Sequence, residues 1–531
     1  MKAGYGVAFC LALWSWICPS GVVTPAAGSA PEHQFSALNK LLDQWQVEEA
    51  DHLIRRFLKN KRSGKQARYL AARLFFLEGD YEKSLSYLKR AGLKNSDRFY
   101  KLVSGTLDET RGMEPVESER YRFLVKSGSP DSILVPYAVQ ALDAQVKALS
   151  LDLGWTPPKI IRIEIAENLE GLSRLTGLSV QAIKTSGTIA VAKYNKLMVT
   201  TPRALLKGYR WVRTVCHELT HMALSQVSLN KAPLWLQEGL AKTLEGRYRR
   251  HVKDLLKLDR YSEHVLALAL SSGKLLSFSK LRPSFAYLPS RESMMLAFAQ
   301  VKTLVGMLIR DKGMAGIREF LSMLASGVGE DSALVKVYKA DFNGLLNRWK
   351  TYVNGLGLKT VPGLVQDFAL EFAKKGVDPD KHEQSMISEK RVKNHLLLGD
   401  MLFKRERVVA AAVEYERADK ASNRIYPLVK RRLARALAES DRISRAVKLL
   451  DQGLEFSPHD PSLLVDRGLL ALQQGDDRTA ARLMESAVRV SPFDPVPHRA
   501  LMGIYSRAGD IARRDRERHV LGILVSRLEE R

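Results

Sequence analysis

Two histidines and two glutamates are spaced along this chain as a metal site requires. His217, Glu218 and His221 form the pattern H-E-x-x-H, and Glu238 follows after sixteen further residues. On a helix, residues i and i+4 lie about one turn apart on one face, so two imidazoles there can bind one ion. Zn²⁺ accepts imidazole and carboxylate ligands, and three protein ligands leave a fourth position open. The spacing therefore predicts a catalytic zinc site with one ion per chain.

The chemistry expected of such a site is hydrolysis by a metal-bound water. Glu218, beside the first histidine, is placed to take a proton from that water and to pass it to a leaving amine. The opposite face of the same helix is predicted to be buried, because apolar residues recur there at helical spacing. These residues are Val212, Val215, Cys216, Leu219 and Ala223. Solvent-exposed or core-capping histidines are the alternative interpretation of the motif.

The residues around the motif resemble the gluzincin branch of the zincin metallopeptidases, within the broad peptidase MA-like family. The resemblance rests on H-E-x-x-H and on the run W-L-x-E-G-x-A, here Trp235 to Ala241, and covers roughly residues 130–327. It implies that both histidines and Glu238 bind zinc and that Glu218 is the general base. The gap before Glu238 is shorter than in the thermolysin and aminopeptidase branches, so the subfamily stays open.

Three β-rich segments precede the motif. Residues 159–165 alternate polar and apolar types, and two further short segments span 188–192 and 196–200. In zincins the strand ahead of the metal helix is an edge strand that holds extended peptide by backbone hydrogen bonds. The resemblance implies this role for one of the two later segments, and ordinary core sheet is the alternative.

One position departs from the family pattern. Relatives often begin a later helix with Y-A-Q-S, and the corresponding residues here are Phe298 to Val301. Phe298 has no hydroxyl and cannot donate a hydrogen bond to a developing oxyanion. Tyr287 is the candidate substitute, and a loop tyrosine packed on the domain surface is its alternative interpretation.

The amino terminus has the features of a secretory signal peptide. Lys2 is followed by an apolar run from Val7 to Ile17 and by small residues at 26–30. The run is too short to predict a membrane span, so we expect a periplasmic or secreted protein, with an uncleaved membrane anchor as the alternative. Cleavage would leave Cys216 as the one remaining cysteine of three, which excludes an internal disulfide.

The carboxy-terminal part of the chain repeats with a period of 34 residues. Prolines and alanines keep this spacing, at Pro427, Pro461 and Pro495 and at Ala412, Ala446 and Ala480. Small residues allow paired helices to pack closely, and proline separates one pair from the next. The pattern resembles tetratricopeptide repeats over about residues 393–524. A weaker signal of the same period spans residues 35–91.

These features predict an α+β zincin-like metallopeptidase domain flanked by all-α tetratricopeptide-type helical repeats. The expected order is a signal peptide (1–30), an amino-terminal helical region (31–105), a linker (106–130), the metallopeptidase domain (131–385) and a carboxy-terminal repeat array (390–525). Such arrays form concave surfaces that bind peptides or protein partners. The alternative is that they only extend or stabilise the catalytic domain.

The chain is strongly basic, with 83 lysines and arginines against 58 acidic residues and a net charge of +25. Such charge can serve nucleic-acid binding, but no nucleic-acid motif accompanies it and the signal peptide directs the chain away from the nucleoid. We therefore expect no nucleic-acid partner. An anionic envelope surface is the partner that the charge favours, and a solvated basic surface is the alternative.

The sequence as a whole predicts an exported zinc-dependent metallopeptidase whose repeats recruit a protein substrate or partner, in envelope protein processing or quality control. The alternative is a non-catalytic repeat scaffold whose relic peptidase domain binds zinc or peptide without cleavage. The complete set of ligands and base favours the enzyme, whereas Phe298 favours the scaffold.

Overall fold

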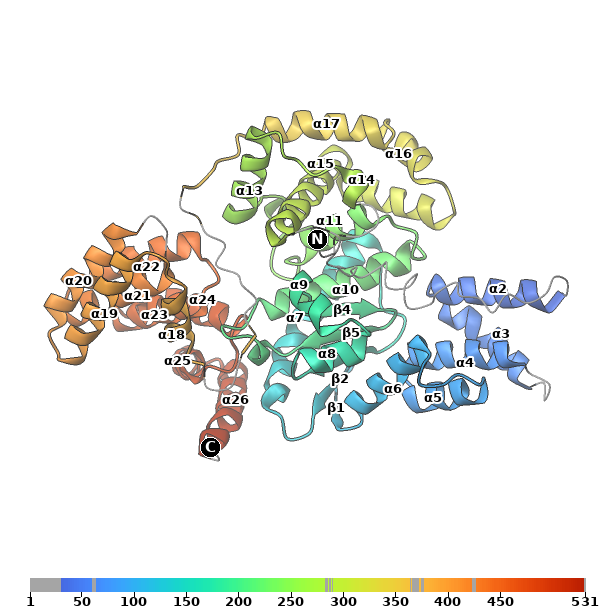
Figure 1. Ribbon diagram of the computed structural model, residues 1–531, viewed down its shortest axis with the longest axis horizontal. Coiled ribbons are helices and arrows are strands. Elements are labelled where there is room, and N and C mark those ends of the chain that lie inside the picture. The colour runs from blue at the N-terminus through green and yellow to red at the C-terminus, as the bar shows by residue number, and fades with distance from the viewer. Residues whose placement is uncertain are drawn as a thin grey trace. The chain divides into compact units, whose positions relative to one another are not determined.

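Figure 1 shows the computed structural model of the protein, which describes residues 30–59, 64–281, 285, 288, 290–362, 364, 372–373, 377–422 and 426–529. Residues 1–29 of the predicted signal peptide lie outside the described residues, and so does Tyr287. The chain divides into two compact units, each discontinuous in sequence. The first unit runs to Thr200 and resumes from Arg213 to Thr360, and the second contains Thr201–Val212 and the chain from Val361 onward.

The first unit begins with a series of helices that carry the amino-terminal repeat pattern. They are α2 (Ala30–Asp43), α3 (Val47–Lys59), α4 (Lys65–Glu78), α5 (Tyr81–Arg90) and α6 (Arg98–Thr110). Leu42, Ile54 and Leu74, from three successive helices, are buried together in one apolar cluster. Gly79, between α4 and α5, has a φ of 84° that closes the turn, a conformation in which glycine carries no Cβ penalty.

A five-stranded mixed sheet follows, in the order β1-β2-β3-β5-β4. Its strands are β1 (Met113–Glu117), β2 (Tyr121–Lys126), β3 (Ile161–Ala166), β4 (Ala190–Lys193) and β5 (Lys196–Thr200). The central pairs β2–β3 and β3–β5 are parallel, and the outer pairs β1–β2 and β5–β4 are antiparallel. The three strands predicted before the metal motif are confirmed as β3, β4 and β5, and β4 occupies an edge of the sheet.

The segment 106–130 is not the linker that the sequence analysis predicts. It contains the end of α6 and the two strands β1 and β2, and β2 pairs in parallel with β3. β1 lies at the other edge of the sheet and has no buried residue, so its sequence lacks the apolar alternation that reveals a half-buried strand.

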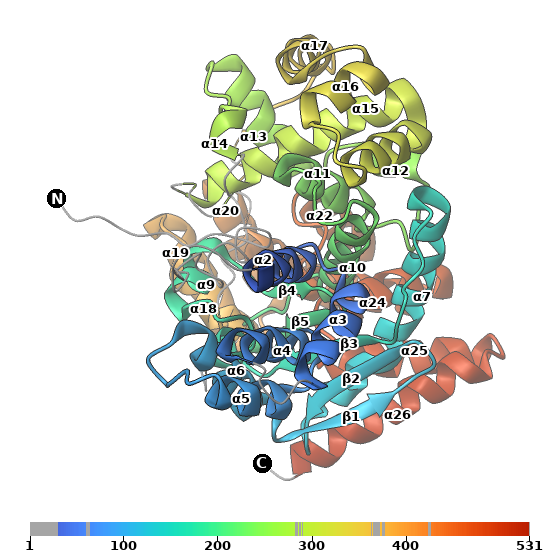
Figure 2. The ribbon, with the colours of Figure 1, turned by 90° about the vertical axis from the view of Figure 1, so that its right-hand side faces the viewer.

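Helices connect and cover the strands of this sheet. They are the 3-10 helix η1 (Pro130–Ile133), α7 (Leu134–Leu153), α8 (Leu169–Thr176) and α9 (Val180–Ser186). The amino-terminal helices are joined to the sheet by a buried polar cluster. In it, the Tyr81 hydroxyl donates to Glu164 of β3, and Lys196 Nζ of β5 donates to the Phe76 carbonyl at 2.6 Å. In Figure 2 α4, α5 and α6 lie beside β1, β2 and β3.

The rest of the first unit is helical. It comprises α10 (Trp211–Val227), α11 (Leu234–Leu244), α12 (Val252–Leu255), α13 (Arg260–Ser271), α14 (Phe278–Leu281), α15 (Arg291–Ala325), α16 (Glu330–Tyr338) and α17 (Phe342–Asn354). Among the described helices α15 has the length and apolar composition to cross a membrane, and 67% of its most apolar stretch is buried. Leu304, Val305 and Leu308 are fully buried, as expected of a core helix.

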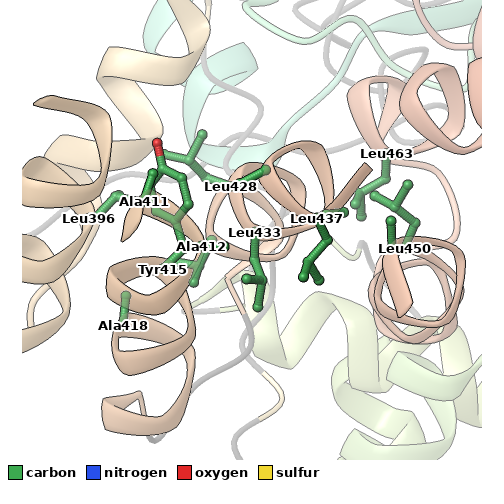
Figure 3. Packing of buried hydrophobic residues seen from close by; sticks show 14 of the residues in the cluster. Leu396, Ala411, Ala412, Tyr415, Ala418, Leu428, Leu433, Leu437, Leu450 and Leu463 are labelled. Carbon is green, nitrogen blue, oxygen red and sulfur yellow. The ribbon is translucent and has the colours of Figure 1, made fainter. Parts of the chain in front are cut away.

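The second unit is an array of helices. It comprises α18 (Pro379–Met386), α19 (Lys390–Lys404), α20 (Val408–Ala421), α21 (Pro427–Glu439), α22 (Ile443–Phe456), α23 (Pro461–Gln473), α24 (Asp477–Val488), α25 (Pro495–Arg507) and α26 (Ile511–Glu529). Figure 3 shows its core, where Tyr415, Leu433, Leu437 and Leu450 come from successive helices. The 3-10 helix η2 (Pro202–Ala204) also belongs to this unit.

The unit that contains the metal motif ends at Thr360, before the boundary at residue 385 predicted for the metallopeptidase domain. The first unit stops at Thr360, and α18 belongs with the repeat array. Asp380 of α18 forms an ion pair with Arg431 of α21 at 2.8 Å, and Glu383 accepts a hydrogen bond from the Leu428 amide at 2.7 Å. These long-range charge contacts have no local pattern in the sequence.

Candidate metal centre

Two helices, α10 and α11, carry the residues that the sequence assigns to the metal. On α10 the predicted apolar stripe is buried, and Cys216, Leu219 and Ala223 are fully inaccessible. The histidines project from another face of this helix. In Figure 1 α10 lies beside β4 and α11 lies close to α15.

Gly239 explains part of the residue pattern around Glu238. A Cβ at this glycine would lie 2.8 Å from the Val301 carbonyl oxygen and 2.5 Å from a Val305 methyl group of α15. α11 can therefore pack at this distance from α15 only with glycine at the contact. The close packing fixes the position of the neighbouring Glu238.

The structure brings together the three predicted ligands. His217 Nε2 and His221 Nε2 lie 3.1 Å apart, and Glu238 Oε2 lies 3.7 Å from the first and 3.5 Å from the second. Ligands of a tetrahedral Zn²⁺ bound at about 2.0–2.1 Å are separated by about 3.3–3.4 Å. The donor set and its spacing thus fit a zinc ion with three protein ligands. Among the described residues these three form the one such cluster.

Glu218 stands beside this cluster without belonging to it. Its side chain is buried, and its carboxylate accepts a hydrogen bond from the backbone amide of Ala192 on β4. Burial raises the pKa of Glu218 above its ordinary value, and the two histidines oppose this rise. The hydrogen bond links the predicted base to the edge strand, whose residues are all buried in this structure.

Glu238 responds differently to the same surroundings. Burial by itself would raise its pKa, but His221 and His217 lower it well below the ordinary range. Glu238 is therefore held as an anion, the form in which a carboxylate binds zinc. The pKa of Glu218 is thus raised and that of Glu238 is lowered, which suits their predicted roles as general base and metal ligand.

Glu245, at the end of α11, contacts the candidate site and is a residue that the sequence analysis missed. It is buried, and its Oε2 accepts a hydrogen bond from His217 Nδ1 at 2.9 Å. Its Oε1 lies 2.7 Å from Arg213 Nε and 3.1 Å from Lys242 Nζ. Burial would raise the pKa of Glu245, but Arg213 and Lys242 hold it well below the ordinary value.

The contact with Glu245 fixes the orientation of the first ligand. A proton on Nδ1 leaves Nε2 as the nitrogen that faces the metal cluster, and a carboxylate partner makes the imidazole more basic. Burial would lower the pKa of His217, but Glu238 and Glu245 raise it to about 10. Glu245 follows Glu238 by seven positions, a spacing that belongs to no motif, so no signal in the sequence points to it.

His221 has a weaker partner of the same kind. Gln237 Oε1 lies 3.4 Å from His221 Nδ1, and Gln237 is itself fully buried and lies 3.4 Å from Ser225 Oγ. Each histidine therefore has an oxygen partner at Nδ1, although only the first partner is charged. This asymmetry makes Glu245 the stronger of the two orienting groups.

Phe298 lies close to Lys242, one of the two cations that pair with Glu245. Its ring is 5.5 Å from the Lys242 ammonium and packs edge-on against Phe285, with ring centroids 5.3 Å apart. The ring therefore shields a cation that pairs with Glu245. The hydroxyl that a family tyrosine would place here is absent, as the sequence shows.

Comparisons with known proteins agree with this geometry. Residues 140–355 match the family model of the Peptidase MA superfamily, and residues 38–97 and 431–495 match a tetratricopeptide repeat model. Residues 140–355 are thus similar to the Peptidase MA superfamily, and segments similar to tetratricopeptide repeats lie on both sides of them in the sequence. The predicted resemblance to the peptidase MA-like family and the predicted fold class are thereby confirmed, whereas the gluzincin branch stays a prediction.

Two other comparisons add little to the family match. No functionally curated protein matches the sequence. Among solved structures, the crystal structure of the APC/C hetero-tetramer Cut9-Hcn1 is similar at 11% sequence identity. The match covers 97% of this chain and 81% of that chain with a TM-score of 0.26, too low to support any argument about fold or function.

Proposed function

We propose that the protein is a zinc-dependent metallopeptidase that hydrolyses peptide bonds. The observation that carries this proposal is the triangle of Nε2, Nε2 and Oε2 atoms, with sides of 3.1, 3.5 and 3.7 Å, beside a separate buried carboxylate. His217 retains 14% side-chain exposure, so the centre is not sealed from solvent. A structural zinc site is closed by a fourth protein ligand, and the described residues offer three.

His217, His221 and Glu238 would hold the ion, which when bound activates a water molecule and polarises the scissile carbonyl. Glu218 acts as the general base, taking a proton from that water and returning it to the leaving amine. Its raised pKa suits a group that must carry a proton for part of the cycle. Glu245 keeps His217 in the ligating tautomer throughout, because it occupies Nδ1.

The test pairs metal analysis with cleavage of an unfolded protein such as casein. We expect one zinc per chain and cleavage in the wild type, and zinc without cleavage in Glu218→Gln, which keeps the shape of the side chain but not its basicity. Glu238→Gln should lose zinc. Zinc binding with no cleavage in the wild type would favour the non-catalytic scaffold, and a wild type without zinc would refute the metal centre.

We also propose that the protein is exported, because Lys2, the apolar run and the small residues that follow it form a signal-peptide pattern. Sequencing of the mature amino terminus after fractionation of the producing cell tests this. Cleavage near residue 30 and recovery outside the cytoplasm are expected, and an intact Met1 in the cytoplasmic fraction would contradict it.

The repeats support a role in recruiting protein substrates or partners, since tetratricopeptide arrays commonly bind proteins. The net charge of +25 adds attraction to anionic envelope surfaces. Co-sedimentation with vesicles of anionic and of neutral lipid measures the second contribution. Salt-sensitive binding to the anionic vesicles alone is expected, and equal binding to both would remove the electrostatic argument.

A further inference from the structure

The segment Thr201–Val212, here called the lead-in segment, connects β5 to the helix that carries the histidines. It belongs to the second unit, although the residues on both sides of it belong to the first. Helix α10 begins at Trp211, inside the lead-in segment, and continues without interruption through His217 and His221. The start of the ligand helix is therefore held by the repeat array.

Backbone hydrogen bonds fix the lead-in segment at two places. Near its start, the Ala373 amide donates to the Ala204 carbonyl at 2.8 Å, next to an antiparallel bridge between Leu205 and Phe372. Near its end, the Tyr209 amide donates to the Val490 carbonyl at 3.1 Å. Backbone contacts with the array therefore hold the lead-in segment near both of its ends.

Lys207, in the middle of the lead-in segment, forms ion pairs with two helices of the array. Its ammonium pairs with Glu383 of α18 and lies 3.0 Å from Asp460 at the start of α23. Both acids also support the array itself, because Asp460 caps α23 through the Leu463 amide and Glu383 accepts from the Leu428 amide. Asp460 is buried, and breaking such a pair leaves an uncompensated charge.

Gly208 and Trp211 complete the attachment. A Cβ at Gly208 would lie 2.2 Å from the Val490 carbonyl oxygen, and its φ is +70°, so both space and conformation require glycine. The buried indole of Trp211 donates from Nε1 to the Val488 carbonyl at 3.2 Å. The first residue of the ligand helix is therefore hydrogen-bonded to the end of α24.

We propose that the carboxy-terminal array is a positioning element of the metal centre, with the lead-in segment as its internal ligand. Trp211 precedes His217 by six residues, about 9 Å along a rigid helix, so a shift at Trp211 is transmitted to both histidines. Because donor atoms must lie within a few tenths of an ångström of their ideal places, loosening the array weakens zinc binding. The inference rests on the proposed metal centre.

The test uses two glycine substitutions in the full-length protein. Gly208→Ala introduces the clash with Val490, whereas Gly509→Ala is its matched control, since Gly509 has a φ of +69° and a Cβ added there would meet nothing within 4 Å. Both carry the same backbone strain within the same unit. Zinc affinity is measured by competition with a chelator, and protection of the lead-in segment by limited trypsin digestion at Arg203, Lys207 and Arg210.

Gly208→Ala should expose the tryptic sites and weaken zinc affinity by about tenfold or more, the size of effect seen when support for a ligand is lost. Gly509→Ala should do neither. Trp211→Phe, which removes only the indole donor and some volume, should shift zinc affinity in the same direction by less, and it keeps the test valid if Gly208→Ala does not fold.

Three results would overturn the inference. Exposed tryptic sites with unchanged zinc affinity would show that the array binds the segment without positioning the ligands. Unchanged protection in both Gly208→Ala and Trp211→Phe would show that these contacts do not hold the segment. Absence of zinc in the wild type would refute the metal centre itself, and this inference with it, which the first two results would not do.

Discussion

Replacing Glu245 by glutamine tests whether a carboxylate outside the ligand set controls the metal site. Glutamine has the same shape and can still accept from His217 Nδ1, but it lacks the charge that faces Arg213 and Lys242, 2.7 and 3.1 Å away. Two cations then stand without their shared partner next to a site that must accept a dication. We expect zinc binding to weaken.

The size of the effect follows from two contributions. Mutation of an outer partner of a ligating histidine costs about 10- to 100-fold in metal affinity, or about 1.4–2.7 kcal/mol. Glu245 is buried, so its charge is poorly screened and the added repulsion from Arg213 and Lys242 is not lost to solvent. Both contributions have the same sign, and we therefore expect a loss close to 100-fold.

The assay is a chelator competition titration at fixed pH, with thermal unfolding recorded for each protein. Asp152→Asn is the control, because Asp152 is another buried carboxylate of this domain, paired with Arg247 at 2.7 Å, that contacts neither histidine. It should lower stability and leave zinc affinity unchanged. A folded Glu245→Gln protein with wild-type zinc affinity would refute the orienting role of Glu245.

Two further predictions concern stability. Gly399→Ala should destabilise the repeat array by about 1–3 kcal/mol, because its Cβ would lie 2.4 Å from the buried Tyr415 ring. Gly503→Ala should stabilise the array by about 0.5–1 kcal/mol, because the added Cβ would meet only the tip of an arginine side chain at 3.6 Å. Denaturant unfolding measures both variants, and a Gly399→Ala protein more stable than Gly503→Ala would contradict the prediction. Burial lowers the pKa of Lys196 from its ordinary 10.5 to about 7. The folded state then binds fewer protons than the unfolded state between these values, so wild-type stability relative to Lys196→Met should rise by about 2 kcal/mol from pH 7 to pH 9. A falling difference would mean that the protein stabilises the lysine cation.

The cluster of three candidate metal ligands could be predicted from sequence because its geometry is local. One helix fixes the separation of His217 and His221, and the run around Glu238 carries its own packing signal in Gly239. Neither of these two signals depends on how the rest of the chain folds. The same holds for the apolar stripe of α10 and for the strands β3 and β5.

Glu245 and the lead-in segment could not be predicted, because their partners are distant in sequence and set by packing. Trp211 and Val488 are 277 residues apart, and Lys207 and Asp460 are 253 apart. Lys207 before α10 and Trp211 at its start carry no recognisable signal in the sequence, because their partners in the array are far away along the chain. β1 was missed for a related reason, since a strand without buried residues resembles a polar linker.

The charges around the candidate metal centre favour the proposed enzyme over a non-catalytic relic. Burial acts on Glu218 and Glu238 alike, yet the pKa of Glu218 is raised and that of Glu238 is lowered. The difference arises because direct contacts with both histidines outweigh burial for Glu238, whereas for Glu218 burial outweighs the lowering effect of the histidines and of the Ala192 amide. One carboxylate is thus suited to remain a ligand and the other to exchange a proton. A scaffold that only bound zinc would need the first alone, so a Glu218→Gln protein that binds zinc as tightly as the wild type but no longer cleaves would show why the second is kept.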